Sequence, residues 1–335
     1  MDQSSKLIVI TGGAGFIGSN LVRYYNKQGF TNIVIIDHFD MGNCWHNLLN
    51  LRYKQLVNKS RAFEFLQENQ DEIGAIFHLG AISDTTCADS SLIMENNYQF
   101  SIDLAIFALN NSIPFLYASS AATYGDGSLG FEDTHEKLHA LKPLNLYGFS
   151  KHAFDLWLLE NGHIDKVTGV KYFNIFGPGE QHKGRMASMV YHMSLHIEKE
   201  GCVKLFASNH KDFVDGGQKR DFFYVKDAVK MTALLLEKGI KGIYNVGMGE
   251  ANTWNMMAKY VFTAMDKPIN IEYIPMPKDL EGKYQNFTRA NMDKFYTCVN
   301  KLGVEFTLDY SFKTAISDYI CNYLKAGERC TTAKF

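Results

Sequence analysis

Three features that would indicate other classes of protein are missing from this sequence of 335 residues. Charge is nearly balanced, with 34 basic and 36 acidic side chains, so no surface for nucleic acid or for an acidic membrane is predicted. No apolar run approaches the ~20 residues of a membrane-spanning helix. The apolar run at 7–10 is too short for the core of a signal peptide. We therefore expect a cytoplasmic protein.

Paired cysteines are missing as well, and there are no internal repeats or low-complexity tracts. No two cysteines have C-x-x-C spacing; they are Cys44, Cys87, Cys202, Cys298, Cys321 and Cys330. Scattered cysteines fit reduced, packed thiols better than a disulfide framework or a zinc site. The sequence therefore predicts no metal site.

The first half of the chain alternates between strand-like and helix-compatible segments. Strands are predicted at 7–10, 32–37, 75–80, 114–120 and 169–177, and helices at 16–28, 61–70, 91–110 and 147–160. Strands that alternate with helices, and that are apolar almost throughout, indicate a parallel sheet covered on both faces. The predicted fold class is α/β, with a doubly wound parallel sheet of the Rossmann type. Such a sheet binds ligands at the carboxyl ends of its strands.

Three glycines, Gly12, Gly15 and Gly18, occupy the turn between the first strand and the first helix. This spacing permits a tight turn, the approach of a diphosphate to the helix N-terminus, and close packing of helix on strand. Glycine turns also serve geometry alone. Here the flanking strand and helix, and the acid Asp37 at the end of the next strand, match a dinucleotide-binding fingerprint.

Asp37 bears on the form of the cofactor. Its carboxylate would accept hydrogen bonds from the adenosine ribose, which favours NAD, because the 2′-phosphate of NADP would meet a negative charge. A nearby basic residue would reverse that preference. The candidates are His38, Arg52, Lys54 and Lys59, each of which is equally consistent with a solvated side chain.

The alternation weakens after residue 178. A helix is expected at 187–199 and a short strand at 201–207, followed by a glycine-containing loop, a strand, and a helix that opens at Asp227. We expect residues 1–178 to form an NAD(P)-binding Rossmann domain to which some later segments return. Residues 179–335 should form mainly a smaller α/β domain that binds the substrate.

A candidate catalytic group lies in the fourth strand-helix unit, the strand at 114–120 and the helix at 147–160. Tyr147 and Lys151 are four residues apart, hence on one face of a helix. A phenol is a poor base at neutral pH, and a neighbouring ammonium favours the phenolate. The strand at 114–120 ends in Ser119 and Ser120, and Ser120 could donate to a substrate oxygen while Tyr147 moves its proton.

These residues make the chain resemble the extended short-chain dehydrogenase/reductases that modify nucleotide sugars, over essentially its whole length. Within that group it is most similar to the ADP-L-glycero-D-manno-heptose 6-epimerase family. The similarity lies in "TGGAGFIGSN", "AIFHLGA", "ENNYQFS", "IPFLYASSAATYG", "KPLNLYGFSK", "KYFNIFGP", "HKGRMAS", "KLF", "QKRDFFYVKD" and "GKYQNFT". The first motif and Y-x-x-x-K belong to the whole superfamily, whereas "ASSAATYG", "HKG-MAS" and "G-YQ-FT" are more particular to the heptose epimerases.

The resemblance implies epimerisation by transient oxidation at C6″ of the heptose, with a recycled nicotinamide cofactor. It assigns the two acid/base roles to Tyr147 and Lys183, assisted by Ser120 and Lys151. From the sequence alone, Lys183 is more readily interpreted as a charged side chain in a loop, with no catalytic role. Ala121 and Ala122 stand where related dehydratases carry an Asp-Glu pair, so elimination of water is not expected.

The resemblance also implies binding residues and partners. For the cofactor these are Gly12, Gly15, Phe16, Ile17, Gly18, Asp37, His38, Lys59, Leu79, Gly80, Ala81, Ile82, Ser83, Asn96, Lys151, Ile175 and Lys183. For the nucleotide-sugar substrate they are Ser120, Asn174, Arg185, His192, Phe206, Arg220 and Tyr284. NADP is the expected cofactor, with NAD possible given Asp37 and Cys44, and family members form homo-oligomers, often pentamers.

Two departures from the family pattern affect ligand contacts. Cys44 lies in the loop where the family often has a lysine for the NADP 2′-phosphate, and Arg185 replaces a small residue after H-K-G. The extra residues at 209–218 are expected to reshape the same pocket.

Three other hypotheses stay open at this point. A UDP-sugar 4-epimerase would share Ser120, Tyr147 and Lys151 without requiring Lys183. A plain dehydrogenase would release the ketone. A non-catalytic NAD(P) sensor that binds a partner protein commonly loses the tyrosine or the lysine, and both are present here.

Overall fold

The computed structural model describes residues 6–40, 42–277 and 285–325. A seven-stranded sheet dominates it, and every neighbouring pair of strands in this sheet is parallel. The strand order is β11 (Gly242–Val246), β6 (Thr168–Tyr172), β5 (Phe115–Ser120), β4 (Ile73–His78), β1 (Leu7–Thr11), β2 (Ile33–Asp37) and β3 (Gln55–Asn58). The predicted Rossmann fold class is confirmed.

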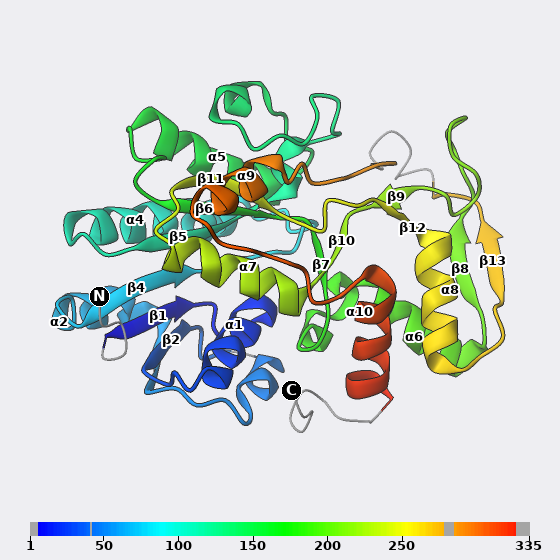
Figure 1. Cartoon of the computed structure of the whole chain (residues 1–335), viewed down its shortest axis with the longest axis horizontal. Helices are drawn as coiled ribbons and strands as arrows, with labels where there is room; N and C mark the ends of the chain where they lie inside the picture. The colour runs from blue at the N-terminus through cyan, green and yellow to red at the C-terminus, as the bar shows by residue number, and fades with distance from the viewer. Residues whose placement is uncertain (1–5, 41, 278–284, 326–335) are drawn as a thin grey trace.

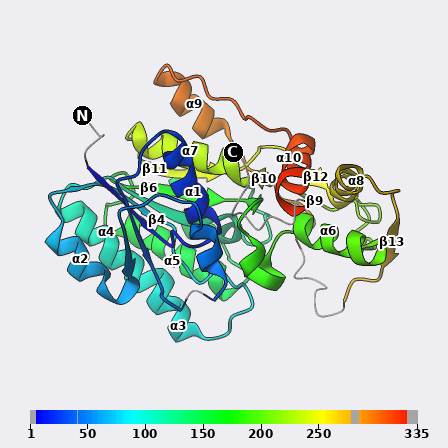
Figure 2. The same cartoon turned by 90° about the horizontal axis from the view of Figure 1, so that it is seen from below.

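Helices cover both faces of this sheet (Figures 1 and 2). One face carries α1 (Phe16–Lys27), α7 (Val225–Glu237) and α9 (Asp293–Lys301). The other face carries α2 (Ala62–Glu68), α4 (Phe100–Asn110) and α5 (Leu146–Glu160). The central strands β1 and β2 consist mainly of Leu, Ile and Val and are almost fully buried, as expected for strands covered on two sides.

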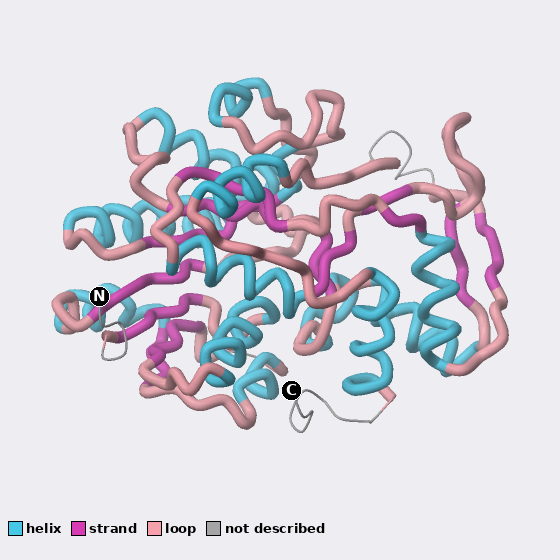
Figure 3. Tube along the Cα trace, viewed as in Figure 1, coloured by secondary structure: helices cyan, strands magenta, loops and turns pink. Residues whose placement is uncertain are grey.

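The second part of the chain builds a smaller unit beside the sheet. Its elements are α6 (Met189–Glu200), β8 (Val203–Phe206), β9 (Lys219–Arg220), β12 (Asn252–Thr253), α8 (Trp254–Met265), β13 (Ile271–Ile274) and α10 (Phe312–Tyr319). Strands β8 and β13 pair in parallel and lie farthest from the main sheet, whereas β9 and β12 form an antiparallel pair (Figure 3).

Buried hydrophobic residues form two clusters that follow this arrangement. The larger cluster surrounds the seven-stranded sheet and includes residues of β11, α7 and α9. The smaller cluster is formed mainly by α6, β8, α8 and α10. Later segments therefore return to the main sheet, as the sequence indicates, while the domain boundary at 178 stays a prediction.

Two predicted elements are divided in the structure. The single strand expected at 169–177 is β6 followed by β7 (Asn174–Phe176), which leaves the main sheet and pairs with β10 (Phe222–Tyr224). The helix expected at 91–110 is α3 (Ser90–Met94), a five-residue π-helical turn at Glu95–Gln99, and α4. The helix expected to open at Asp227 begins at Val225.

Candidate active site

The glycine turn connects β1 to α1 and has the geometry that a bound diphosphate requires. Gly12 has a φ of 68°, and a Cβ atom there would lie 2.5 Å from Cα of Gly80. At Gly18 a Cβ atom would overlap the carbonyl oxygen of Gly12. Gly15 is the N-cap of α1 and has no capping side chain, so the first N–H groups of the helix face the turn. This combination suits an anionic ligand.

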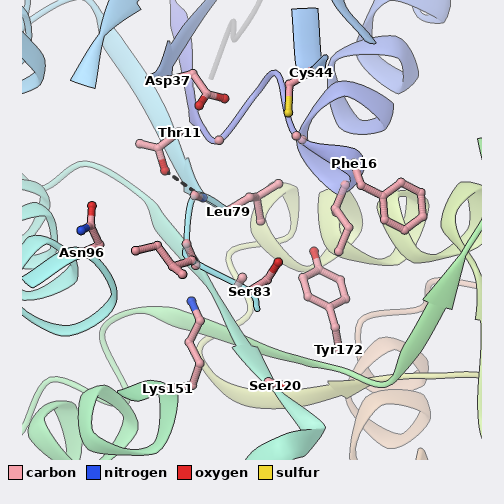
Figure 4. Close-up of a pocket in the computed structure, with 18 of the residues that line it drawn as sticks. Thr11, Phe16, Asp37, Cys44, Leu79, Ser83, Asn96, Ser120, Lys151 and Tyr172 are labelled. Carbon is pink, nitrogen blue, oxygen red and sulfur yellow. Dashed lines mark hydrogen bonds between the residues drawn. The ribbon is translucent and has the colours of Figure 1, made fainter. Parts of the chain in front are cut away.

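A cavity of about 390 Å³ lies at the carboxyl ends of the central strands, beside this turn. All of the cofactor and catalytic residues predicted from the sequence line it: Gly12, Gly15, Phe16, Ile17, Gly18, Asp37, His38, Lys59, Leu79, Gly80, Ala81, Ile82, Ser83, Asn96, Ser120, Tyr147, Lys151, Ile175 and Lys183. Figure 4 shows Asp37 and Cys44 at one end of the cavity and Ser120, Lys151 and Tyr172 at the other.

The cavity also has lining residues that the sequence did not single out for this role. They are Thr11, Ile36, Cys44, Phe100, Ala118, Ser119, Tyr172, Phe173 and His182. Thr11, Ile36 and Ser119 lie at or next to the carboxyl ends of strands, so their positions in the sequence are a usable signal. Tyr172 and Phe173 share this signal, since β6 ends at Tyr172, whereas Phe100 and His182 reach the cavity through tertiary packing, which no local pattern encodes.

Asp37 lies at the end of β2 and is held by backbone donors. The N–H groups of Ala14 and His38 donate to its two oxygens at 2.9 and 2.8 Å. Burial raises the pKa of Asp37, and these hydrogen bonds partly offset the rise. The neighbouring thiol of Cys44 has its pKa raised to about 11 by burial and by the charge of Asp37, so it stays protonated at neutral pH.

Lys59, the nearest lysine to Asp37 in the cavity lining, has partners of its own. Its ammonium lies 4.4 Å from the centre of the Phe100 ring and hydrogen-bonds the side chain of Asn96. Burial lowers the pKa of Lys59.

The catalytic candidates stand on β5 and α5. Asn145 caps α5 by accepting from the N–H of Gly148 at 2.8 Å, which fixes the first turn that carries Tyr147. Tyr147 hydrogen-bonds Ser120, the last residue of β5. Burial raises the pKa of Tyr147 despite this bond, in the opposite direction to the one that the neighbouring lysine predicts. Burial also lowers the pKa of Lys151 to about 8, against the opposing charge of Asp155.

Lys183 comes from a separate segment, the short helix Gln181–Met186. Its ammonium lies 5.5 Å from the centre of the Phe16 ring, and burial lowers its pKa although Glu180 acts in the opposite direction. Glu180 anchors the segment by accepting from the hydroxyl of Ser188 at 2.7 Å. A lysine with a lowered pKa exchanges a proton more readily near neutral pH, as a general acid or base must.

Arg185 ties this short helix to the loop after β4. Its guanidinium donates to Asp84 at 3.1 Å and also contacts the hydroxyl of Thr86. These two bonds connect the segment of Lys183 to the loop of Ser83, and both Lys183 and Ser83 line the cavity.

Asn97, in the π-helical turn, is fully buried and joins two walls of the site. Its side chain accepts from the N–H of Ile82 at 2.8 Å and donates to the carbonyl of the same residue at 3.0 Å. It also donates to Ser150 on α5 at 3.1 Å. Asn96, the residue before it in the same turn, lines the cavity.

Beneath the catalytic residues lies a fully buried polar network centred on Asp155 of α5. Its carboxylate accepts from the hydroxyls of Tyr117 and Ser119, both at 2.8 Å, and lies 3.0 Å from the ammonium of Lys171. Lys171 also donates to Thr123 at 2.6 Å. The network fastens α5 to β5 and β6 one turn away from Lys151.

Among the predicted substrate residues that the structure describes, Ser120 alone lines this cavity. Asn174 is exposed on β7, Arg220 is buried on β9, and Phe206 ends β8. His192 lies on α6, and its Nε2 atom is buried with no hydrogen-bond partner among the described residues. Tyr284 lies outside the described residues.

Two kinds of site are absent from the described parts of the chain. Within residues 6–40, 42–277 and 285–325, no group of three or more His, Cys, Asp or Glu side chains is arranged to hold a metal ion. In the same residues no helix is long and apolar enough to cross a membrane.

A dinucleotide-type glycine turn, an acid at the end of β2 and a Ser-Tyr-Lys group around one cavity are typical of enzymes that use a nicotinamide cofactor to oxidise or reduce a carbon that bears oxygen. The family model described as the NAD dependent epimerase/dehydratase family matches residues 8–247, and the chain belongs to this family.

Relatives with assigned names point to one branch of the family. The ADP-L-glycero-D-manno-heptose-6-epimerase of Nitratidesulfovibrio vulgaris is 43% identical over 325 residues, which are 96% of this chain and 99% of the relative. The protein of the same name from Fusobacterium nucleatum is 40% identical over 330 residues, 95% of this chain and 98% of that one. The family predicted from the sequence is confirmed.

Two solved structures of other epimerases have the same fold as this chain. The crystal structure of the Helicobacter pylori ADP-L-glycero-D-manno-heptose-6-epimerase has a TM-score of 0.78 at 28% identity, covering 96% of this chain and 97% of that chain. The UDP-glucose 4-epimerase of Thermotoga maritima has a TM-score of 0.77 at 22% identity, covering 96% and 100%. At that identity the second likeness shows the fold alone.

Proposed function

We propose that this protein is an ADP-L-glycero-D-manno-heptose 6-epimerase, an isomerase that interconverts ADP-D-glycero-β-D-manno-heptose and ADP-L-glycero-β-D-manno-heptose. The observation that supports it best is that Tyr147 and Lys183, from segments far apart in the sequence, line one cavity. Inversion of a carbinol centre needs a proton-transferring group for each of the two orientations of the sugar, and these residues supply the pair. The high identity to the named relatives over nearly the whole chain supports the choice of substrate.

A bound nicotinamide would supply the chemistry of removing hydride from C6″ and returning it to the opposite face. The chain supplies the proton transfers. Tyr147 takes the proton of the C6″ hydroxyl in one orientation, while Ser120 donates a hydrogen bond to the same oxygen. After the ketone has rotated in the cavity to present its opposite face, Lys183 gives a proton to that oxygen. Lys151 would hold the ribose of the cofactor. In the reverse direction the two acid/base roles exchange.

The residues at the adenosine end fit either form of the cofactor, and we propose that NADP is used, with NAD as the alternative. His38 is the basic side chain that we assign to the 2′-phosphate, because Lys59 already contacts Asn96 and Phe100. Asp37 favours NAD. Asp37→Asn should therefore raise the NADP-to-NAD affinity ratio at least tenfold, measured by fluorescence titration of each cofactor. An unchanged ratio would remove Asp37 from the choice of cofactor.

The alternative function is a UDP-sugar 4-epimerase, which would not need Lys183. The deciding experiment incubates the purified protein with ADP-D-glycero-D-manno-heptose and, separately, with UDP-galactose, and follows sugar configuration by NMR. We expect inversion at C6″ of the heptose and none at C4 of the hexose. Lys183→Ala should lose turnover and keep its cofactor. Inversion of the hexose alone, or normal heptose turnover in Lys183→Ala, would overturn the assignment.

We further propose a cytoplasmic homo-oligomer, pentameric as in the family, that supplies heptose for the core of lipopolysaccharide. Sedimentation equilibrium of the purified chain tests the assembly, and a monomer would contradict it.

A further inference from the structure

Three side-chain amides outside the cavity have buried atoms that no group in the described parts of the chain hydrogen-bonds. Gln218 is 1% exposed, and neither its Nε2 nor its Oε1 atom has a hydrogen-bond partner among the described residues. Asn252 is 4% exposed, and its Nδ2 atom is likewise without a partner in that part of the chain. Buried polar groups in folded proteins are nearly always satisfied, so these amides mark a place where a ligand or an ordered water supplies the partner.

Strand pairing brings these amides to one face. Asn252 of β12 is directly opposite Arg220 of β9, so the two side chains point the same way. Gln218 is two residues before Arg220 and therefore shares that face. On the other edge of β9, Lys219 bridges Phe287, which places the neighbouring Asn286 on the face of Gln218. The Oδ1 atom of Asn286 is also buried without a partner among the described residues.

This face continues toward the catalytic residues. Strand β10 follows β9 at once, and its Phe222 pairs with Asn174 of β7, whose next residue, Ile175, lines the cavity. Figure 1 shows β7 and β10 between the main sheet and the ribbon of β9 and β12. Phe222 is four positions after Gln218, which is about 13 Å along an extended chain. A substrate whose sugar reaches Tyr147 must therefore be extended in order to reach Gln218.

The chemistry of the face identifies the part of the substrate that it binds. A diphosphate offers only acceptors and suits Arg220, whereas an amide donates and accepts at once, as ribose hydroxyls and base edges do. We propose that Gln218, aided by Asn252 and Asn286, binds the nucleoside of the nucleotide-sugar substrate and is a specificity-determining residue. This inference rests on the proposed function in so far as the nucleotide is ADP.

The test measures binding of ADP, and separately of UDP, to the cofactor-saturated full chain by isothermal titration calorimetry. Gln218→Met keeps the length of the side chain and removes the amide, and Gln67→Met on the exposed surface of α2 is the matched control. We expect Gln218→Met to bind ADP about fivefold to twentyfold more weakly. The KM for the nucleotide sugar should rise by the same factor with kcat within twofold, and the control should match the wild type.

A second measurement separates binding from a structural role. An amide that waits for a ligand destabilises the free protein, so the melting temperature of Gln218→Met should stay level or rise. A lower melting temperature, or an affinity for ADP within twofold of wild type, would overturn the inference. If the wild type binds UDP in place of ADP, the proposed function is wrong. The inference about Gln218 is then tested by the loss of affinity for UDP in Gln218→Met. Gln218→Ala repeats the test if the methionine variant does not fold.

Discussion

The buried ion pair between Asp155 and Lys171 makes a strong prediction about stability. Both side chains are 0% exposed, and Asp155→Asn would preserve the shape of the network while leaving the Lys171 ammonium without a counter-charge. Thr123 and the Tyr124 ring, 4.8 Å away, would be its remaining partners. Removing one member of a buried pair costs about 3–5 kcal/mol. For a chain of this length that corresponds to a fall in melting temperature of roughly 4–7 °C.

The assay is urea and thermal unfolding followed by circular dichroism, with a double variant as the control. Lys171→Met in the background of Asp155→Asn removes the stranded charge, so it should recover at least half of the lost stability. Alone, Lys171→Met should cost less than Asp155→Asn, because the carboxylate keeps its bonds from Tyr117 and Ser119. A loss below about 1 kcal/mol in Asp155→Asn, or purely additive effects in the double variant, would refute this account of the network.

Three further predictions concern catalysis, the ion pair of Arg185 with Asp84, and the dependence of stability on pH. Tyr147→Phe should lower kcat by about 10²- to 10⁴-fold with cofactor binding kept, and a near-normal rate would remove the phenol from the mechanism. Arg185→Ala should speed cofactor release by up to about fivefold in stopped-flow at low salt, since an exposed pair contributes about 0–1 kcal/mol; a full effect persisting in 1 M salt would contradict the ionic explanation. Burial lowers the pKa of His78 well below 6.5, so the unfolded chain alone gains its proton under acid conditions. As the pH falls below about 6.5, the free energy of unfolding of the wild type relative to that of His78→Gln should thus decrease by ~1.4 kcal/mol per pH unit. A difference in urea unfolding that stays constant with pH would refute this.

The sequence could predict the features that depend on short-range pattern. The glycine turn, the buried strands and the capped helix that carries Tyr147 are each encoded within a few neighbouring residues. Strand β3 escaped notice because Gln55–Asn58 mixes polar and apolar residues at an edge of the sheet. The division of β6 from β7 was also missed, because the apolar run continues through Phe173 and only pairing with β10 separates the two.

The candidate site divides in the same way. Residues at the ends of consecutive strands were predictable, because a parallel sheet brings these ends to one edge. The buried network of Asp155 and Lys171 was not, since the two residues are 16 positions apart and meet only through the register of β5, β6 and α5. Gln218 falls in the segment 209–218 that is predicted to reshape the substrate pocket, but a single glutamine in a loop has no periodic signal, and its individual role emerges only from the strand pairing around it.

The π-helical turn at Glu95–Gln99 has a consequence for how this region can vary. A π-helical turn holds one residue more than an α-helical turn, and each residue of a helix advances the direction of its side chain by about 100°. Deleting a single residue here would restore an ordinary helical turn and shift the directions of the side chains within the turn itself, while the helical segments on either side keep their faces. Asn96 would leave the cavity wall, and Asn97 would lose its hold on Ile82 and Ser150. The segment should therefore accept many substitutions on its exposed side, whereas its length is under strict constraint.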